Sequence, residues 1–236
     1  MVNIEDIEVI AFDADDTLWS NEPFFQEIER KFEGLLGSYG APSHISAELY
    51  KTEMENLERY GYGTKGFTLS MIETALRVSH GQVSAEVIEQ ILLLGKSLLD
   101  MPIELLPGAE YTLKELNAYR LIVVTKGDLV DQQRKLDRSG LEPYFEHIEI
   151  MSEKSEEEYR TLLDTLEITP NQFMMIGNSL KSDIQPVLNI GGAAIHIPFD
   201  VTWKHEVVEE FSHPHLRTIK SIVHVHRALY SYETIE

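Results

Sequence analysis

Acidic residues gather at the end of the first apolar segment of the chain. Residues 9–13, VIAFD, form a short apolar run, and Asp13 and Asp15 follow each other there with one residue between them. This spacing can bring two carboxyl groups, or one carboxylate and one backbone carbonyl, toward a shared site. Adjacent carboxylates repel each other and need a cation or a proton between them, and Mg²⁺ prefers such oxygen ligands and can also bridge a phosphate. The loop is therefore a candidate magnesium site, although an ordinary acidic loop would look the same.

Asp16 is interpreted as a turn or cap residue and Thr17 as a residue that shapes the loop.

Further polar residues follow three later apolar runs. They are Thr125, Lys126 and Asp128 after the run at 121–125, Lys154 after a weaker run at 147–151, and Asn178, Ser179 and Asp183 after the run at 173–176. Ligands of open α/β sheets bind beyond the carboxyl ends of the strands, so these side chains are expected at one sheet edge. Taken singly, Thr125 could merely end a strand and Lys154 could be a solvated residue at a helix start.

The elements that must position these residues alternate along the chain. Apolar runs at 9–13, 121–125, 147–151, 173–176 and 193–197 are separated by helix-like stretches. Such alternation is typical of an α/β fold with a doubly wound parallel sheet. His196 lies inside the last run and is interpreted as a packed core residue.

The stretch between the first two runs breaks this rhythm. It contains amphipathic helical patterns at 23–39, 46–60, 68–79 and 84–99 and no convincing buried strand. We therefore predict an α/β core made of residues 1–20 and 106–236, with an all-helical cap domain at residues 21–105.

Composition excludes several classes of function. The 236 residues carry 40 acidic and 20 basic side chains, a formal net charge of −20, which argues against nucleic-acid binding. No apolar run is long enough to span a bilayer, the N-terminus lacks the pattern of a signal peptide, and there is no cysteine. These features predict a cytoplasmic protein without a membrane partner, and they leave its oligomeric state open. An anionic substrate would need a local positive field from a metal, lysines or helix N-termini.

The four clusters together resemble the haloacid dehalogenase (HAD) superfamily. The segment AFDADDTLW, Thr125, Lys154 and the segment IGNSLKSDI stand in the order of its four motifs. Their conjunction is far more specific than any one motif. The helical insertion looks like the cap that follows the nucleophile loop in this superfamily, so the resemblance implies a Rossmann-like core and an active site between core and cap.

The resemblance implies a role for each matched residue. Asp13 would attack phosphorus, and Asp15 would protonate the leaving oxygen and then deprotonate water. Thr125, Lys126 and Lys154 would bind the phosphoryl group. A Mg²⁺ ion would be held by a set that is implied to be Asp13, Asp15, Asn178 and Asp183. Asn178 departs from the pattern, because the family usually has an aspartate there.

The sequence therefore predicts a Mg²⁺-dependent phosphatase that hydrolyses a small phosphorylated metabolite, a phosphate monoester, through an aspartyl-phosphate intermediate. A 2-haloacid dehalogenase, a phosphomutase and a non-catalytic binding protein on this scaffold are the alternatives. Asp15 argues against dehalogenation, since a departing halide needs no proton. A non-catalytic binding protein on this scaffold would be expected to lack Asp13 or Lys154, and both are present.

Overall fold

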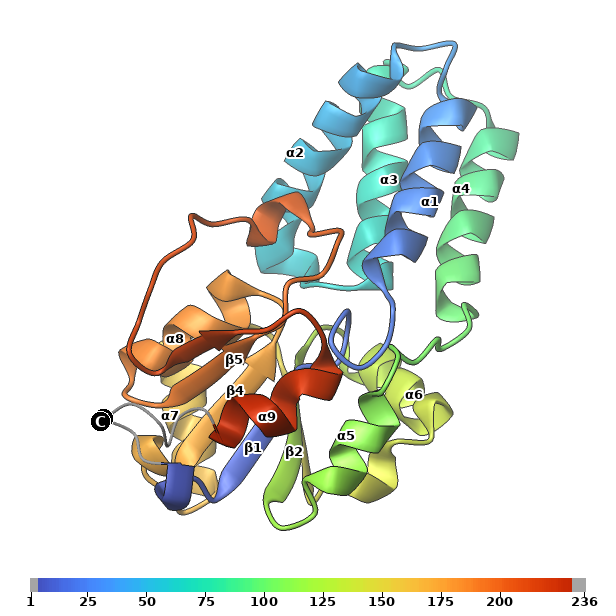
Figure 1. The fold of residues 1–236 in the computed structure, drawn as a ribbon. Helices are drawn as coiled ribbons and strands as arrows, with labels where there is room; N and C mark the ends of the chain where they lie inside the picture. The colour runs from blue at the N-terminus through green and yellow to red at the C-terminus, as the bar shows by residue number, and fades with distance from the viewer. Residues whose placement is uncertain (1–3, 231–236) are drawn as a thin grey trace. The chain divides into compact units, whose positions relative to one another are not determined.

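The computed structural model describes residues 4–230 and divides into two compact units (Figure 1). The first unit comprises the described parts of Met1–Glu22, Ile103–Lys126 and Gln132–Glu236. The second comprises Pro23–Pro102 and Gly127–Asp131.

The first unit is built on a six-stranded parallel sheet. Its strands are β1 (Val9–Phe12), β2 (Arg120–Lys126), β3 (His147–Met151), β4 (Phe173–Gly177), β5 (Ala193–His196) and β6 (Leu216–Thr218). They lie in the order β3-β2-β1-β4-β5-β6, and every neighbouring pair is parallel. The predicted doubly wound parallel sheet is confirmed. Strand β6 was not predicted, because it has three residues, none of them buried, and so shows no apolar run.

Helices cover both faces of this sheet because its strands are apolar on both sides. Ile10 and Phe12 pack toward one face, against residues of α5 (Ala109–Glu115), α6 (Leu129–Ser139) and α9 (Val225–Tyr230). Val9 and Ala11 pack toward the other face, against α7 (Glu156–Thr165) and α8 (Gln185–Asn189). Burial of a side chain such as Ile10 or Phe12 contributes about 1.5–3 kcal/mol. Both faces can be followed in Figure 1.

The strand order places the switch of the sheet at β1. From β1 the chain adds β2 and β3 on one side and then returns to add β4, β5 and β6 on the other. Phe12 pairs with Val123 of β2 and with Ile176 of β4, so the residues just beyond these three positions share one edge. This is where open α/β sheets bind ligands.

The second unit is helical. It contains α1 (Glu22–Leu35) from its second residue onward, α2 (Pro42–Tyr60), α3 (Thr64–Val78) and α4 (Ala85–Leu99). Residues from all four helices form its core, among them Phe32, Leu49, Met71 and Ile91. The predicted insertion at 21–105 overlaps this unit, and its role as a cap stays a prediction.

Local chemistry decides where the helices of this unit begin, and the start of α2 differs from the predicted one whereas that of α4 agrees with it. Helix α2 begins at Pro42 rather than at residue 46, because Ala41 is extended and proline suits the first helical position. Helix α4 begins after Ser84, whose hydroxyl accepts a hydrogen bond from Val87 N. Among the described residues, no helix combines the length and apolar character needed to cross a bilayer.

Candidate active site

The loop after β1 is held by its own acidic residues. The Asp13 backbone N donates to Ile176 O at 2.9 Å, which continues the pairing of β1 with β4. Asp16 has φ 61°, a left-handed conformation that a short polar side chain tolerates. Its carboxylate accepts hydrogen bonds from the backbone N of Asn21 and of Glu22, at 2.8 Å and 3.1 Å. Asp16 therefore fixes the turn into α1, in agreement with its interpretation as a turn or cap residue.

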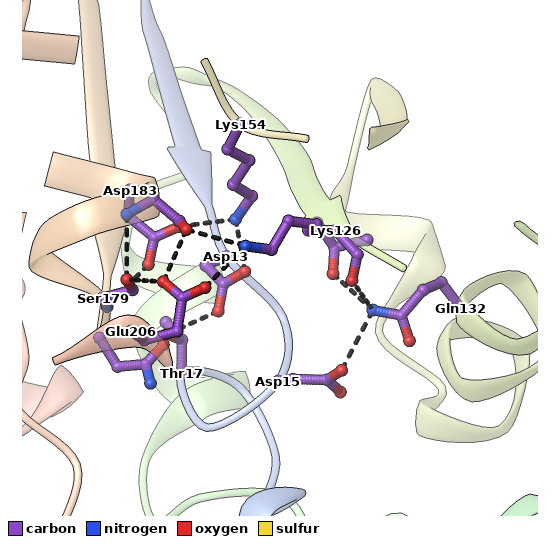
Figure 2. Close-up of polar contacts among 12 residues, drawn as sticks. Asp13, Asp15, Thr17, Lys126, Gln132, Lys154, Ser179, Asp183 and Glu206 are labelled. Atoms are coloured by element: carbon purple, nitrogen blue, oxygen red, sulfur yellow. Dashed lines mark hydrogen bonds and ion pairs between the residues drawn. The ribbon is translucent and has the colours of Figure 1, made fainter. Parts of the chain in front are cut away.

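Three predicted site residues meet in one buried group (Figure 2). Lys154 Nζ donates to Asp13 Oδ1 at 2.6 Å and to Asp183 Oδ1 at 2.6 Å. Lys154 lies beyond β3, and Asp183 lies in a π-helical turn, Leu180–Ile184, beyond β4. One ammonium thus lies between two carboxylates at the carboxyl edge of the sheet, and all three side chains are almost fully buried.

Burial and charge act against each other in this group. Burial raises the pKa of Asp13 to about 7, with the charge of Lys154 opposing the rise and that of Asp183 adding to it. Burial lowers the pKa of Lys154, but the neighbouring carboxylates of Asp13 and Asp183 outweigh this and hold it above its ordinary value. Lys154 therefore stays charged. Any further positive charge placed beside Asp13 would stabilise its ionised form.

Thr17 links Asn178 to the other oxygen of Asp13. Thr17 Oγ1 lies 3.2 Å from Asp13 Oδ2 and 3.3 Å from Asn178 Oδ1, so one hydroxyl adjoins both oxygens. His196 lies behind this loop, with Nε2 at 3.0 Å from the backbone O of Asn178, and since a carbonyl accepts, the ring donates. His196 is buried, as predicted, but it also supports the loop that carries Asn178.

This donor set fits a hard divalent cation. Asp13 Oδ2 and Asn178 Oδ1 are an anionic and a neutral oxygen that flank one hydroxyl, that of Thr17, and such oxygens are the ligands that Mg²⁺ prefers. Asp183 accepts from Lys154 and from Ser179 N at 2.9 Å, so both of its oxygens already have donors. Within residues 4–230 there is no group of three His, Asp or Glu side chains arranged to hold a metal. Any metal would thus depend on amide and backbone oxygens and on water.

The carboxylate of Asp15 lies apart from this group (Figure 2). It accepts from Trp19 Nε1 at 2.7 Å, Gln132 Nε2 at 3.1 Å and Lys135 Nζ at 2.9 Å. Its contacts thus come from its own loop and from α6, rather than from Lys154 or Asp183. A metal contact from Asp15 would therefore use its backbone carbonyl, which is one of the two arrangements that the spacing allows.

Thr125 lies at the end of β2 beside the same helix. Gln132 Nε2 donates to Thr125 Oγ1 at 2.6 Å and to the backbone O of Lys126 at 3.2 Å. Because the oxygen of Thr125 accepts this bond, its hydroxyl hydrogen can be donated to a ligand. Gln132 thus holds Thr125 and Asp15 in one network.

The side chain of Lys126 has an unexpected partner. Its Nζ donates to Glu206 Oε1 at 2.7 Å and to Ser182 Oγ at 2.9 Å. The ammonium is therefore paired with a carboxylate of the chain itself. Asp128, a charged residue that follows β2, pairs with Lys65 inside the second unit.

Gln132, Lys135, His196 and Glu206 contact predicted site residues, and these contacts were not predicted. Gln132 and Lys135 are three residues apart on a helix that directly follows a motif strand, so their shared face could have indicated a polar contact with the site. His196 ends a strand next to β4, and the strand order alone would have placed it near Asn178. Glu206 lies in an irregular segment and has no comparable signal.

Comparisons with known proteins identify the family and the fold of the chain. A family model described as haloacid dehalogenase-like hydrolase matches residues 7–191. A crystal structure of a haloacid dehalogenase-like family hydrolase from Xanthomonas campestris is 35% identical, with a TM-score of 0.88 over 96% of this chain and 92% of that one. A glyceraldehyde 3-phosphate phosphatase from Pyrococcus abyssi is 27% identical over 78% of this chain and 79% of its own length. A 2-haloacid dehalogenase from Pseudomonas syringae pv. Tomato DC3000 shares the fold, with a TM-score of 0.64, 17% identity and coverage of 96% and 99%. The chain is therefore an enzyme of the haloacid dehalogenase-like hydrolase family.

Proposed function

We propose that the protein is a Mg²⁺-dependent phosphatase that hydrolyses a small phosphate monoester through a phosphorylated Asp13. The observation that carries this proposal is the buried group of Asp13, Lys154 and Asp183 at the carboxyl end of β1. The phosphatase relative from Pyrococcus abyssi supports the reaction class.

In the first half of the reaction, a carboxylate oxygen of Asp13 attacks phosphorus, and the bond from phosphorus to the ester oxygen breaks. Lys154 and the hydroxyl of Thr125 bind the phosphoryl oxygens, and Asp15 gives its proton to the departing alcohol. In the second half, Asp15 takes a proton from water and the water oxygen attacks phosphorus. The bond from phosphorus to Asp13 breaks, which releases phosphate and restores the carboxylate of Asp13. Lys135 Nζ lies 2.9 Å from Asp15 Oδ2 and holds the carboxyl group of Asp15 in position.

The metal is assigned to oxygens on the Asn178 side of Asp13. Asp13 and Asn178 would hold Mg²⁺ together with the backbone carbonyl of Asp15, and Asp183 would contribute through water. When bound, the ion supplies positive charge that offsets the charge of the phosphoryl oxygens.

The alternatives explain fewer of these contacts. The dehalogenase from Pseudomonas syringae supports the fold alone. A halide leaves without a proton, so dehalogenation gives no reason for the three donors that hold Asp15. A phosphomutase would use the same first half-reaction, with a second hydroxyl in place of water.

The reaction class is tested by measuring two products in parallel. The protein is incubated with Mg²⁺ and a series of small phosphate esters, and the release of phosphate is followed; halide release is followed with 2-chloropropionate. We expect phosphate release that requires Mg²⁺ and no halide release. Halide release without phosphate release would contradict the proposal.

Replacing Asp15 by asparagine should slow transfer from alkyl phosphates far more than transfer from p-nitrophenyl phosphate. An alkoxide needs a proton to leave, whereas nitrophenolate does not, and general acid catalysis contributes about 10²–10⁴-fold. Single-turnover measurements with both esters isolate this first step. Asp16→Asn is the matched control, since the carboxylate of Asp16 accepts hydrogen bonds from the backbone N of Asn21 and of Glu22. Equal losses on the two esters would remove Asp15 from the acid role.

Replacing Asn178 by aspartate should tighten Mg²⁺ binding by about tenfold, because a carboxylate adds a formal charge where the amide oxygen of asparagine has none. Calorimetric titration of the substrate-free protein with Mg²⁺ measures this directly. The control is Asn171→Asp, the same change at an exposed position. Equal affinities for both variants and the wild type would show that Asn178 does not contact the metal.

A further inference from the structure

The connection between β5 and β6 brings an acidic residue to the catalytic edge of the sheet. Glu206 ends a short helical turn, Lys204–Glu206, in an otherwise irregular segment. Its carboxylate accepts from Lys126 Nζ at 2.7 Å, from Ser182 Oγ at 2.6 Å and from Ser179 Oγ (Figure 2). Only 12% of the Glu206 side chain is exposed, and the same holds for Lys126.

The three donors form what we call the anion corner: Lys126, Ser179 and Ser182. Lys126 directly follows Thr125 at the end of β2, and both serines lie in the loop after β4 that carries Asp183. Ser179 N donates to Asp183 Oδ2, and Asp183 accepts in turn from Lys154. The corner is thus linked to the catalytic group by a short chain of hydrogen bonds.

An ammonium and two hydroxyls are the donors that bind a carboxylate or a phosphate of a ligand. In this protein they bind Glu206. Although burial opposes ionisation, Lys126 and the two serine hydroxyls lower the pKa of Glu206 to about 2. A ligand anion that displaced Glu206 would leave this carboxylate without its donors, which is unfavourable for a largely buried charge.

We propose that Glu206 determines substrate specificity by closing the anion corner to a second anionic group. Resting on the phosphatase function proposed above, this names the substrate class as a phosphate monoester whose alcohol part carries no carboxylate or second phosphate. Specificity of this kind comes from repulsion of the wrong ligand as much as from attraction of the right one.

The test compares glycerol 3-phosphate with 3-phosphoglycerate. The two have chains of the same length, but 3-phosphoglycerate carries a carboxylate in place of the terminal CH2OH group. Glu206→Gln keeps the size of the side chain and an oxygen that accepts hydrogen bonds, but it removes the charge. We expect the ratio of kcat/KM for 3-phosphoglycerate to that for glycerol 3-phosphate to rise by about tenfold or more. Glu209→Gln, the same change at an exposed position of the segment, should leave the ratio unchanged.

A double variant separates repulsion from disturbance of the segment. If Glu206→Gln acts by releasing Lys126 to a substrate carboxylate, adding Lys126→Gln should abolish the gain. A gain that persists in Lys126→Gln/Glu206→Gln, or that appears equally in Glu209→Gln, would overturn the proposal.

A binding measurement separates this proposal from the phosphatase function. Calorimetry on Asp13→Asn, with and without Glu206→Gln, gives Kd for both compounds. These values do not depend on whether the wild-type protein hydrolyses either compound. If Glu206→Gln changes the ratio of the two Kd values but no protein that retains Asp13 hydrolyses either compound, the role of the anion corner would be supported and the phosphatase function would be contradicted. Hydrolysis with unchanged ratios of Kd and kcat/KM would contradict the role of Glu206 alone.

Discussion

Replacing Asp13 by asparagine is expected to lower kcat by about four orders of magnitude or more, because the amide cannot form the covalent bond to phosphorus. Asparagine has nearly the same shape and its oxygen can still accept the hydrogen bond of Lys154. The loss should therefore appear in kcat measured with saturating Mg²⁺ and ester, and the variant should still fold. Turnover within about tenfold of the wild type would exclude a covalent role for Asp13.

The stability of Asp13→Asn provides the control. The folded protein raises the pKa of Asp13 from 3.8 to about 7 through burial. A carboxyl group whose pKa is raised in the folded state contributes to the free energy of unfolding. This contribution is fully present below about pH 4 and is lost as the pH rises through about 7. Asparagine does not ionise, so at about pH 8 the variant should be at least as stable as the wild type in urea unfolding. An unfolded variant would make its inactivity uninformative.

Replacing Lys154 by methionine is expected to remove activity and to destabilise the protein. The substitution leaves Asp13 and Asp183 buried together without their shared cation. Breaking a buried ion pair from one side lowers the free energy of unfolding by about 3–5 kcal/mol. Lys220→Met, at an exposed position of the same unit, is the control and should change the free energy of unfolding by less than about 0.5 kcal/mol.

The sign of the pH dependence makes this prediction more specific. Without Lys154, the pKa of Asp13 in the folded protein rises further, while that in the unfolded chain stays near 3.8. The unfolded chain then releases a proton that the folded protein keeps, so stability falls as the pH rises above about 4. Urea unfolding should show a larger difference between variant and wild type at about pH 8 than at about pH 5. A difference that is constant with pH would indicate lost packing of the lysine stem instead.

Most of the sheet could be predicted because β1, β2, β4 and β5 are buried on both faces and appear as apolar runs. The polar residues after those runs then indicate the site, because parallel strands end at one edge. Strand β6 could not be predicted, since it has no buried residue and its pairing with β5 depends on the sheet being formed. The order of the motifs identified Asp13, Lys154 and Asp183, but no spacing shows that one ammonium lies between the two carboxylates.

Charges that act through tertiary contacts were the least predictable. Asp15 belongs to the DxD loop, yet the direction of its carboxylate is decided by Gln132 and Lys135, more than 100 residues away in the chain. Glu206 is one of many acidic residues in a chain of net charge −20, and nothing in its neighbourhood distinguishes it. The folded structure shows that Lys126 contacts Glu206 at 2.7 Å and, at the longer distance of 3.5 Å, Glu153.

Detection of a phosphoryl group on Asp13 tests the central claim most directly. Asp15→Asn should form the intermediate from p-nitrophenyl phosphate and hydrolyse it slowly, because its base is missing. The reaction with Mg²⁺ is stopped in acid, and the peptides are analysed by mass spectrometry. We predict that the peptide containing Asp13 gains the mass of one phosphoryl group in Asp15→Asn, and that no such peptide forms in Asp13→Asn/Asp15→Asn. Release of phosphate without a phosphorylated peptide, or with the phosphoryl group on another residue, would contradict the covalent role of Asp13.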